Sequence, residues 1–538
     1  MAASVAAAAL LLTAALLGAA PCPAAAQSDP CFSQLQVLGT HNSYHQAPPQ
    51  EVLQAFGTLS AGPLLAWQYS HPRLSAQLDA GVRAFELDVY WDPAGGLYGQ
   101  AAGLKLAGRP GWLDDPRYKQ PGFKVLHIPD FDFRSSCLLL AECLAEIKAW
   151  SDAHPSHLPI LVYMEVKGAG QLEDGLGDAV LALLQGTLDR ATAPGPASFV
   201  QVPNTTAQTF QDLQAEYLSA FGSPASPRGQ LLAPDDVRAA LGAGPGADLQ
   251  QLLLRAPGQA CPWPSLEVMR GRVLPIVILR GGSSEAAALE QAYPGLEGSM
   301  MWVEQGGRTP LPQAAFRASA VSRLGSGGDL LLDLPANATG LVAALAQSVE
   351  GVVAAGFVVR ARADADTLEA RAGFTGRRDA MIAAGPQVVA TDFLVPANQQ
   401  RAQGSTAPLY STDYNVTLPG GQVARCARGF SSAPAAEDVP VQMASAGQRD
   451  GIYCGPLEGA PPGRVAISPD SVAEGTAAGG PPPAPGAGAA AQPQPPSSGG
   501  AVAASPPPPP MSGGSSSRRA AAAGAAGAAV LAAVALVV

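Results

Sequence analysis

The chain has 538 residues and a formal net charge of −11, from 32 Lys and Arg against 43 Asp and Glu. Because no basic patch stands out, nucleic acid is not an expected partner, and an anionic ligand would need local rather than global attraction. With 60 Gly, 51 Pro and only 14% charged residues, the composition indicates one barrel-sized domain with tails rich in residues that do not pack.

Residues 1–26 are typical of a secretory signal peptide. The apolar run Ala6–Ala20 is followed by the small triplet Ala24–Ala26, which fits an A-x-A cleavage site, although no Lys or Arg precedes the run. Cleavage there leaves six cysteines. In an exported chain an even number favours three disulfides over free buried thiols, with Cys137–Cys143 as the most local pair. Sequons that suit an exported glycoprotein lie at Asn204, Asn337 and Asn415.

Along residues 27–430, short apolar runs alternate with helical stretches, which predicts βα units and a parallel sheet. The eight runs are Leu35–Gly39, Ala84–Val89, Phe123–Leu126, Pro159–Val166, Val273–Leu279, Met300–Val303, Phe357–Arg360 and Val388–Ala390. The helical stretches include Leu138–His154, Asp174–Leu188, Asp235–Leu241, Leu341–Ala355 and Gly376–Ala384. This pattern predicts an α/β fold of the closed (β/α)8 barrel type. The connection from Gly168 to Trp263, after the fourth run, is too long for a simple crossover and predicts an insertion.

The C-terminal part of the sequence changes character twice. Residues 431–470 are expected to be an extension, and residues 471–515 a disordered stalk rich in Pro, Gly, Ala and Ser. Residues 516–538 contain the uncharged apolar run Ala520–Val538, preceded by small residues and a polar spacer. That order predicts a GPI-attachment signal, with a tail anchor as the alternative. We therefore expect a monomer that enters the secretory pathway and acts outside the cell or at its surface, held there by a GPI anchor.

Polar side chains lie where the first four predicted strands end. In chain order they are His41, Asn42, Glu86, Asp88, His127, Glu165 and Lys167. Taken singly, each has a purely structural explanation, such as a helix cap, a core histidine or an ion pair. Taken together, four consecutive strand ends with such residues predict a site at the mouth of the barrel, where barrel enzymes place their catalytic groups.

The spacing and type of the acidic residues predict a metal ion. Glu86 and Asp88 share one face of a strand, so their charges repel unless a cation or a proton lies between them. With Asn42 and Glu165 they form an oxygen-only ligand set, which suits a hard cation, calcium first and magnesium second. The cationic side chains expected to bind an anionic substrate beside this ion are Lys167, Arg360 and Arg362.

The two strand-end histidines, His41 and His127, lie on different predicted strands and could flank a phosphorus centre. Displacement at a phosphodiester needs a base for the attacking hydroxyl and an acid for the leaving alcohol, and histidine titrates in the right range for both. A divalent ion beside the attacking oxygen lowers the pKa of that oxygen. These residues predict phosphodiester cleavage, and their types leave open whether water or a hydroxyl of the substrate attacks.

Four motifs carry a resemblance to a known family. They are Gly39–Tyr44 (GTHNSY), Gly81–Asp88 (GVRAFELD), Lys124–His127 (KVLH) and Pro159–Glu165 (PILVYME). In order and spacing they resemble the calcium-dependent phosphoinositide-specific phospholipase C family, in its secreted, bacterial-like branch. The resemblance extends from Cys31 to Cys426 and includes Met269–Leu274, Gly356–Asp366 and Gly385–Asp392.

This resemblance implies a phospholipase C-like TIM-type barrel over residues 27–430, with calcium as the cofactor. It implies a phosphoric diester hydrolase or lyase that cleaves phosphatidylinositol, or a related lipid at a membrane surface, into diacylglycerol and a cyclic inositol phosphate. The inositol 2-hydroxyl would then be the nucleophile. The chain lacks the calcium-binding helix-loop-helix repeats and lipid-docking domains of the intracellular enzymes, which leaves open any preference for phosphorylated headgroups.

The resemblance also implies a role for each site residue. His41 would assist at the phosphate and in proton transfer, and His127 would protonate the diacylglycerol oxygen. Lys167 would lie near the phosphate or the inositol. Either Glu86 or Asp88 could also serve as the base for the 2-hydroxyl. The implied calcium ligands are Asn42, Glu86, Asp88 and Glu165.

Two other functions are compatible with parts of the pattern. A glycerophosphodiester phosphodiesterase is also a barrel enzyme with paired histidines, a Glu-x-Asp and a metal. Such enzymes typically open with His-Arg-Gly, whereas Asn42 follows His41 here. The second is a non-catalytic surface binding protein on a phospholipase C-like barrel. Such a protein is expected to have lost site residues, whereas all six expected positions are occupied in this chain.

Overall fold

The structure is a computed structural model that describes residues 30–57, 65–169, 178–222, 226, 229–254, 261–319, 335–403, 405–427 and 450–452. The expected signal peptide, stalk and residues 516–538 lie outside these ranges, as does most of the expected C-terminal extension. Those assignments stay predictions. None of the helices in the described ranges combines the length and the apolar character needed to cross a bilayer.

Within the described residues, eight parallel strands close into the barrel that the sequence predicts. In barrel order they are β1 (Leu35–Thr40), β2 (Val82–Tyr90), β4 (Ile160–Lys167), β5 (Val273–Arg280), β6 (Trp302–Gly306), β7 (Phe316–Ser319), β8 (Val358–Arg362) and β9 (Val388–Thr391). Strand β1 pairs in parallel with both β2 and β9, which closes the ring. The strands are buried almost throughout, so most of them appear in the sequence as continuous apolar runs.

Two strands differ from the prediction. The run Phe123–Leu126 is not a barrel strand: it contains only β3 (Lys124–Val125), which pairs antiparallel with the last two residues of β2. The barrel strand that the pattern missed is β7, whose sequence Phe-Arg-Ala-Ser has no β-branched residue. It is a strand because β6 and β8 bond to it on either side, a tertiary context that overrides local propensity.

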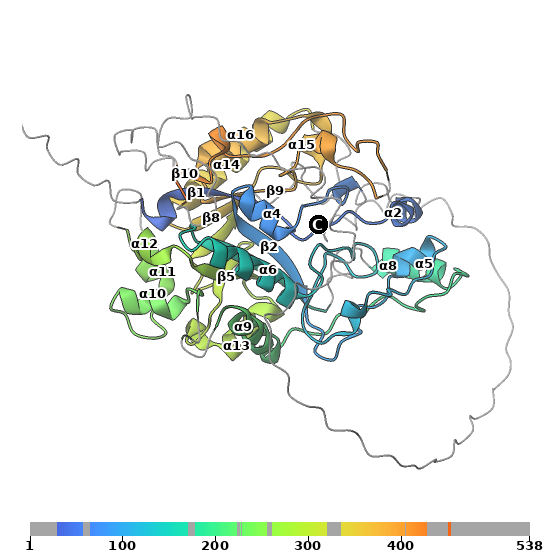
Figure 1. The fold of residues 1–538 in the computed structure, drawn as a ribbon, viewed down its shortest axis with the longest axis horizontal. Coiled ribbons are helices and arrows are strands. Elements are labelled where there is room, and N and C mark those ends of the chain that lie inside the picture. Colours follow the sequence, from blue (N-terminus) through green and yellow to red (C-terminus); the bar gives the residue numbers. More distant parts are fainter. Residues whose placement is uncertain are drawn as a thin grey trace, which may run out of the picture.

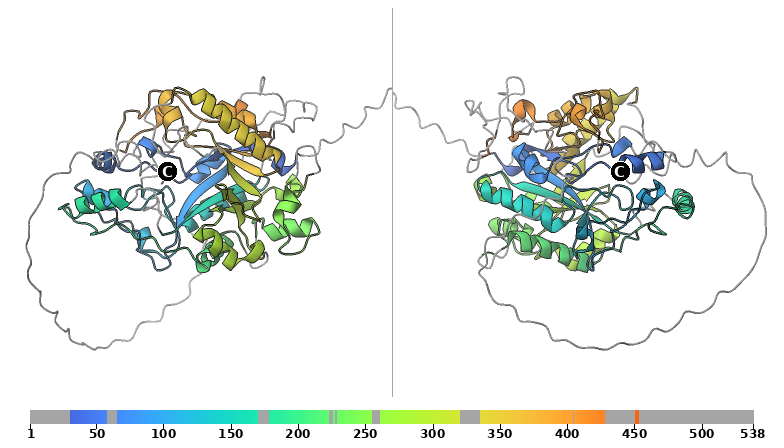
Figure 2. Two further views of the ribbon diagram at one scale, coloured as in Figure 1. Left: turned by 180° about the vertical axis from the view of Figure 1, so that it is seen from behind. Right: turned by 45° about the vertical axis from the view of Figure 1, so that its right-hand side comes forward.

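The predicted helices are all present, with small differences at their ends. In chain order they are α6 (Leu140–Ala153), α8 (Asp178–Leu188), α10 (Pro234–Ala240), α14 (Ala338–Ala354) and α16 (Gly376–Ala384). Further helices of the described residues are α2 (Gln50–Gly57), α4 (Leu74–Asp79), α5 (Ala102–Leu106), α9 (Ala207–Phe221), α11 (Leu249–Leu253), α12 (Leu266–Met269), α13 (Ser284–Ala292) and α15 (Leu368–Ala372). Figures 1 and 2 show the strands at the centre of the molecule with helices around them.

Short elements complete the described chain. They are the 3-10 helices η1 (Phe32–Gln34), η2 (Pro116–Lys119), η3 (Pro294–Leu296), η4 (Ala397–Gln399) and η5 (Pro419–Gly421), and the strand β10 (Ala424–Cys426). Strand β10 pairs antiparallel with β1. The predicted insertion follows β4, where α8 to α12 precede β5. Because β3 is outside the barrel, β4 is the third barrel strand rather than the fourth.

Helices α2, α5 and α8 form a group beyond the carboxyl ends of the strands, on the right of Figure 1. Their shared apolar core includes Val52, Ala102 and Leu184, one from each helix. Ile128 and Phe131 belong to the same core and follow the predicted catalytic residue His127 in the chain. This group, which we term the cap, therefore lies directly beside the candidate site.

Two disulfides join described residues. Cys137–Cys143 is the local pair that the sequence predicts, and Cys31–Cys261 ties the segment before β1 to the end of the insertion. Cys426 is also disulfide-bonded. The cysteines thus form disulfides, as expected of an exported chain.

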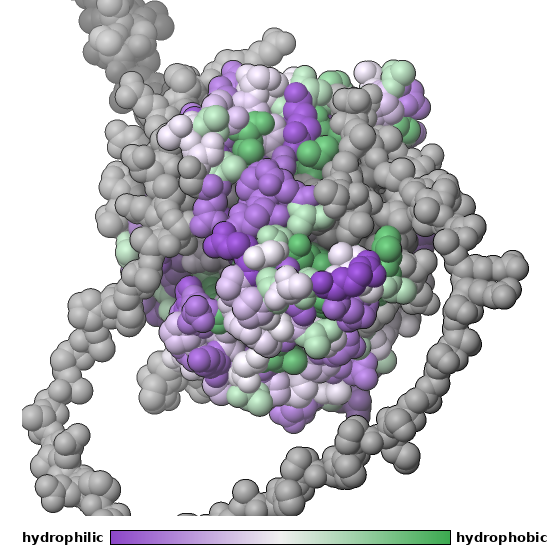
Figure 3. Space-filling model, turned by 90° about the vertical axis from the view of Figure 1, so that its right-hand side faces the viewer, coloured by the Kyte–Doolittle hydropathy of each residue, from purple (hydrophilic) through white to green (hydrophobic). Residues whose placement is uncertain are grey.

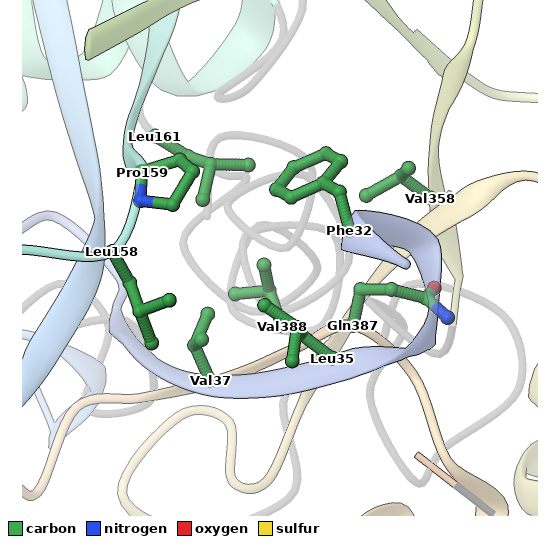
Figure 4. A pocket seen from close by; sticks show the side chains of 9 residues that line it. All are labelled: Phe32, Leu35, Val37, Leu158, Pro159, Leu161, Val358, Gln387 and Val388. Atoms are coloured by element: carbon green, nitrogen blue, oxygen red, sulfur yellow. The ribbon is translucent and has the colours of Figure 1, made fainter. Parts of the chain in front are cut away.

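The opposite end of the barrel is closed by apolar side chains. Figure 4 shows a small cavity there, lined by Phe32, Leu35, Val37, Leu158, Pro159, Leu161, Val358, Gln387 and Val388. Phe32 of η1 points into it and packs edge-on against Trp263, with ring centroids 4.9 Å apart. Because this cavity lies at the amino ends of the strands, it is part of the barrel floor and not a substrate site.

Asp450, which falls in the expected C-terminal extension, is buried at this floor. Its carboxylate accepts two hydrogen bonds from the Arg83 guanidinium, at 2.8 and 2.9 Å, and one from the Leu158 backbone N–H at 2.7 Å. The Arg83 guanidinium also lies over the ring of Trp150, 4.7 Å from its centroid. Residue 450 therefore belongs to the folded domain.

Candidate active site

The carboxyl ends of neighbouring strands bring the predicted acidic residues together. In the β2–β4 register Asp88 pairs with Glu165, and Tyr90 pairs with Lys167. Because alternate residues share a face of a strand, Glu86 lies on the same face as Asp88. Ligand oxygens of Glu86, Asp88 and Glu165 all lie within 4.8 Å of one another.

The charges in this carboxylate cluster favour a bound cation. The Lys167 ammonium lies 3.1 Å from both Asp88 and Glu165. Burial raises the pKa of Asp88 well above its ordinary value, although Lys167 opposes the rise. Burial also disfavours ionisation of Glu165, but Lys167 outweighs it and the pKa of Glu165 is lowered. The buried Oδ1 of Asp88 has no hydrogen-bond partner among the described residues. Three converging carboxylates with one unpartnered oxygen fit a calcium ion.

Asn42, the fourth expected ligand, adopts a left-handed backbone conformation with φ 44° directly after β1. Asparagine tolerates this conformation better than most residues. Its side-chain oxygen lies 3.5 Å from the Tyr44 hydroxyl. The next residue, Ser43, is bonded to the backbone of Glu86 through both its N–H and its hydroxyl, at 2.9 Å each. This turn is thereby fixed beside β2.

Arg360 occupies the barrel interior beneath the carboxylates. It donates to Glu86 at 2.7 Å and forms a bidentate pair with Glu304, at 3.0 and 2.7 Å. Its guanidinium also lies 4.7 Å from the centroid of the Tyr163 ring. Burial is the largest effect on Glu86 and disfavours its ionised form, but Arg360, His41 and Arg362 together outweigh it, and the net pKa of Glu86 is lowered. Arg360 therefore helps to keep Glu86 ionised. The expected contact of Arg360 with substrate stays a prediction.

His41 is oriented by Asp392, which directly follows β9. Its Nδ1 lies 2.7 Å from Asp392, while its Nε2 lies 4.0 Å from Glu86. Arg362 donates to the other oxygen of Asp392 at 2.6 Å, so this predicted substrate residue is also paired with a carboxylate. Burial and then Arg362 hold the pKa of His41 well below its ordinary value. A neutral His41 that donates from Nδ1 presents an unprotonated Nε2, which suits a base.

His127 is oriented by Asp132, at a distance of 2.8 Å from Nδ1. The same carboxylate oxygen lies 2.8 Å from Nε2 of His45, whose Nδ1 lies 3.0 Å from the carbonyl of Tyr69. Burial lowers the pKa of His127, and Asp132 opposes this effect. With Nδ1 held by Asp132, the His127 Nε2 is left for a substrate.

Sequence reasoning missed several residues that support this site. Asp392 had a detectable signal, because it is a polar residue directly after a predicted strand. Glu304 lies inside β6, where its sequence position alone suggests an outward-facing charge. His45 and Asp132 lie in loops, and their approach to His127 depends on a backbone path that periodicity does not describe.

The site thus combines a neutral histidine, a second histidine held by a carboxylate, and an oxygen cluster that fits a hard cation. A base, an acid and a cation site are the parts needed for displacement at a phosphodiester. The barrel places all of them at one mouth.

Comparisons with known proteins agree with this chemistry. Residues 31–323 and 338–428 match the sequence model of the family described as phosphoinositide phospholipase C, Ca2+-dependent. A search of the curated proteins finds no match.

Several solved structures of phospholipases C are similar to this chain. A calcium-dependent phosphoinositol-specific phospholipase C from the Gram-negative bacterium Pseudomonas sp is 16% identical, with a TM-score of 0.36, and the match covers 68% of this chain and 92% of that one. A Ca2+-dependent phosphatidylinositol-specific enzyme from Streptomyces antibioticus is 15% identical, with a TM-score of 0.33 and coverage of 67% and 94%. A phosphatidylinositol-specific phospholipase C from Staphylococcus aureus is 10% identical, with a TM-score of 0.27, and the match covers 71% of this chain and 90% of that one.

Proposed function

Because the chain belongs to the calcium-dependent phosphoinositide phospholipase C family, we propose that it cleaves phosphatidylinositol into diacylglycerol and a cyclic inositol phosphate. The observation that carries this proposal is the cluster of Glu86, Asp88 and Glu165, with one buried oxygen unpartnered, beside two histidines held by carboxylates. Related phosphodiester lipids with the same headgroup linkage would enter the same site.

In this proposal Glu86, Asp88 and Glu165 hold calcium together with Asn42. When bound, calcium lowers the pKa of the attacking hydroxyl and neutralises charge that develops on the phosphate. Arg360 holds Glu86 in its ionised form, as its 2.7 Å contact supports. The carboxylates also attract Lys167, which is then close enough to the mouth to approach the substrate phosphate.

The two histidines divide the proton transfers. The 2-hydroxyl of inositol attacks phosphorus, and its proton passes to His41 Nε2 or to Glu86. The bond from phosphorus to the diacylglycerol oxygen breaks, and His127 Nε2 gives its proton to that oxygen. The products are then a neutral alcohol and a cyclic phosphodiester. Arg362 supports this arrangement through Asp392, which orients His41.

The test is an assay on phosphatidylinositol vesicles with and without a chelator, with products identified by phosphorus NMR. We expect a cyclic phosphate in the presence of calcium and no turnover with the chelator. Glycerol phosphate would instead indicate a glycerophosphodiester phosphodiesterase. Calcium binding without cleavage would indicate a non-catalytic binding protein. Unchanged activity in chelator would remove the metal role of the carboxylates.

Calcium binding is also measurable without activity. A ligand at 100 times its Kd stabilises a folded protein by about 2.7 kcal/mol, so calcium should raise the unfolding temperature of this chain. Asp88→Asn, which removes a charge from the cluster, should abolish that rise. Asp189→Asn is the matched control, because Asp189 is exposed at the end of α8 and contacts Gln185. A rise that survives Asp88→Asn would place calcium elsewhere.

We propose further that the protein works outside the cell. The disulfides Cys31–Cys261 and Cys137–Cys143 support this, because such bonds persist in oxidising compartments. The sequon residues Asn204 and Asn337 are exposed and hence open to glycosylation. Attachment through a GPI anchor and action at a membrane surface as a monomer stay predictions from the sequence.

A further inference from the structure

A tight turn directly after His127 joins the candidate site to the cap. The turn covers Ile128–Asp132, and two backbone hydrogen bonds close it, from the Ile128 N–H to the Asp132 carbonyl at 3.1 Å and from the Asp132 N–H to the Ile128 carbonyl at 2.9 Å. At the end of the turn, the Asp132 carboxylate accepts from His127 Nδ1 at 2.8 Å. Because the two ends of the turn are bonded to each other, a shift of its tip moves Asp132 as well.

Asp130 lies at the tip of this turn and is completely buried. Its backbone is left-handed, with a φ of 72°. Aspartate adopts this conformation more readily than most residues other than glycine. In this conformation both the carboxylate and the backbone carbonyl of Asp130 contact α5.

Asp130 accepts three hydrogen bonds from backbone groups outside the turn. Its two carboxylate oxygens accept one each, from the Ala102 N–H at 2.9 Å and from the Val200 N–H at 2.7 Å. Its backbone carbonyl accepts from the Gly103 N–H at 2.9 Å. Ala102 and Gly103 begin α5, and Val200 belongs to the insertion, after α8. One buried residue therefore fastens the turn to two other segments.

The contact between α5 and the turn leaves no space for a side chain at position 103. A Cβ added to Gly103 would lie 2.6 Å from the carbonyl oxygen of Asp130, and 3.0 Å from Phe131 and from Val52. A glycine is needed where two backbones approach this closely. Phe131 also packs against Phe199, with ring centroids 5.7 Å apart. Polar and apolar contacts together hold the turn against the cap.

We propose that Asp130 is a positioning residue for His127, because the docking of α5 on the turn sets where Asp132 holds the imidazole. The inference rests on the proposed function in so far as His127 is the acid. Within the described ranges, Asp130 forms no hydrogen bond or ion pair with His127 or with the carboxylate cluster. Its effect on His127 therefore passes through the turn.

Asp130→Asn should disturb the turn and change no group that contacts His127. The asparagine amide has one acceptor oxygen and one NH2 group, whereas both carboxylate oxygens of Asp130 accept. Either the Ala102 N–H or the Val200 N–H would then face a donor in place of an acceptor. The turn should move to relieve this conflict, and Asp132 should move with it.

A second substitution changes the same contact from the side of the cap. In Gly103→Ala the new Cβ would collide with the carbonyl oxygen of Asp130. Gly186→Ala is the matched control, because Gly186 lies on α8 of the same cap and an added Cβ there would come within 4 Å only of Arg190, at 3.7 Å. Both variants replace a cap glycine by alanine, and one of them alone should reach His127.

The direct readout is the proton that His127 Nδ1 donates to Asp132, observed by NMR of the full chain with calcium present. Its signal is assigned by its loss in His127→Ala. We expect the signal to move and broaden in Asp130→Asn and in Gly103→Ala, and to keep its wild-type position in Gly186→Ala. An unchanged signal in the first two variants would overturn the inference. This readout needs no phospholipase activity, so it decides the inference even if the proposed function fails.

Hydrogen exchange of the wild-type chain covers the case in which these variants do not fold. Amide groups that become exposed in one local opening show the same protection. If α5 holds the turn, the N–H groups of Ala102, Val200 and Asp132 should share one level of protection. An Asp132 N–H that stays protected while Ala102 and Val200 exchange would overturn the inference.

Activity gives a readout that a purely structural role would not move. A displaced acid costs more when the leaving group is poor, because a good leaving group needs no proton. Asp130→Asn and Gly103→Ala should lower the rate on phosphatidylinositol by up to about 10²-fold, as a displacement of about 1 Å can. Their rates on a nitrophenyl ester of inositol phosphate should fall much less, and Gly186→Ala should change neither rate. Equal losses on both substrates would contradict a role that acts through His127.

Discussion

His41 and His127 both use Nδ1 to contact a buried carboxylate, which leaves Nε2 of each ring for another partner. Their surroundings differ in charge. Burial lowers the pKa of His41 and Arg362, bonded to the other oxygen of Asp392, lowers it further, whereas Asp132 opposes the effect of burial on the pKa of His127. Because their surroundings differ in this way, we assign the base role to His41 and the acid role to His127 in the proposed reaction.

The acid role proposed for His127 predicts a dependence on the leaving group. His127→Ala should lower the rate on phosphatidylinositol by about 10²–10⁴, which is the usual contribution of a general acid. A substrate with a good leaving group, such as a nitrophenyl ester of inositol phosphate, needs no acid and should lose much less. The measurement is the ratio of the two rates in the variant and in the wild type. Equal losses on both substrates would count against His127 as the acid.

Strand β2 links the site to the floor of the barrel. Glu86 and Asp88 lie near its carboxyl end, and Arg83 near its amino end is buried with Asp450 as its carboxylate partner. Arg270 also donates to the backbone carbonyl of Asp450 at 3.1 Å. A residue far along the chain therefore helps to hold the strand that carries two of the proposed calcium ligands.

This pair predicts a large effect on stability. Asp450→Ala would leave the Arg83 guanidinium buried without its carboxylate, and breaking a buried pair in this way costs about 3–5 kcal/mol. Urea denaturation measures the change in the free energy of unfolding. Combining Asp450→Ala with Arg83→Met should recover part of the loss, because no buried charge remains unpaired. An exposed control, Asp189→Ala, should have little effect, and a loss in Asp450→Ala as small as in that control would refute the role of the pair.

Most barrel strands could be predicted because burial on both faces makes them apolar runs. Strand β7 could not, since its four residues include Arg317 and Ser319 and its pairing depends on neighbours distant in sequence. The run Phe123–Leu126 has the composition of a strand but lies beyond the end of β2 as an antiparallel ribbon. Local pattern thus identified strand-forming segments better than it identified their place in the barrel.

The site residues also fall into two groups, those whose position could be predicted from the strands and those whose position could not. Glu86, Asp88 and Glu165 could be predicted as a cluster because strand ends in a parallel barrel meet at one mouth. Asp132 and His45 could not, because loop geometry brings them to His127. The pairing of Arg360 with Glu304 also could not be predicted. In the sequence, a charged pair inside a barrel looks the same as two charged residues that face outward.

On the scale of the whole molecule, the cap extends the mouth of the barrel. Its surface carries both hydrophobic and hydrophilic residues. Figure 3 looks onto the side where α2, α5 and α8 lie, and shows hydrophobic residues among hydrophilic ones. Trp112, which follows α5, is 52% exposed. Arg109, in the same connection, is exposed and pairs with Glu51 of α2. An exposed tryptophan in the same connection as an exposed arginine is suited to the boundary between lipid and water.

Trp112 is therefore predicted to contact the lipid surface. Trp112→Ala should weaken binding to phosphatidylinositol vesicles about tenfold, as expected for about 1.5 kcal/mol of apolar contact. The rate of the Trp112→Ala variant on a soluble short-chain substrate should not change. Val268→Ala is the matched control, because Val268 is 54% exposed on α12, which precedes the amino end of β5. Equal effects of the two substitutions on vesicle binding would contradict this orientation.

The burial of Asp450 at the barrel floor also sets the direction in which the protein can be tethered. The described chain ends at residue 452, two residues after this contact, on the face opposite the mouth. A fusion partner or an immobilising tag joined directly after residue 452 would therefore sit on the floor side of the barrel and leave the mouth unobstructed.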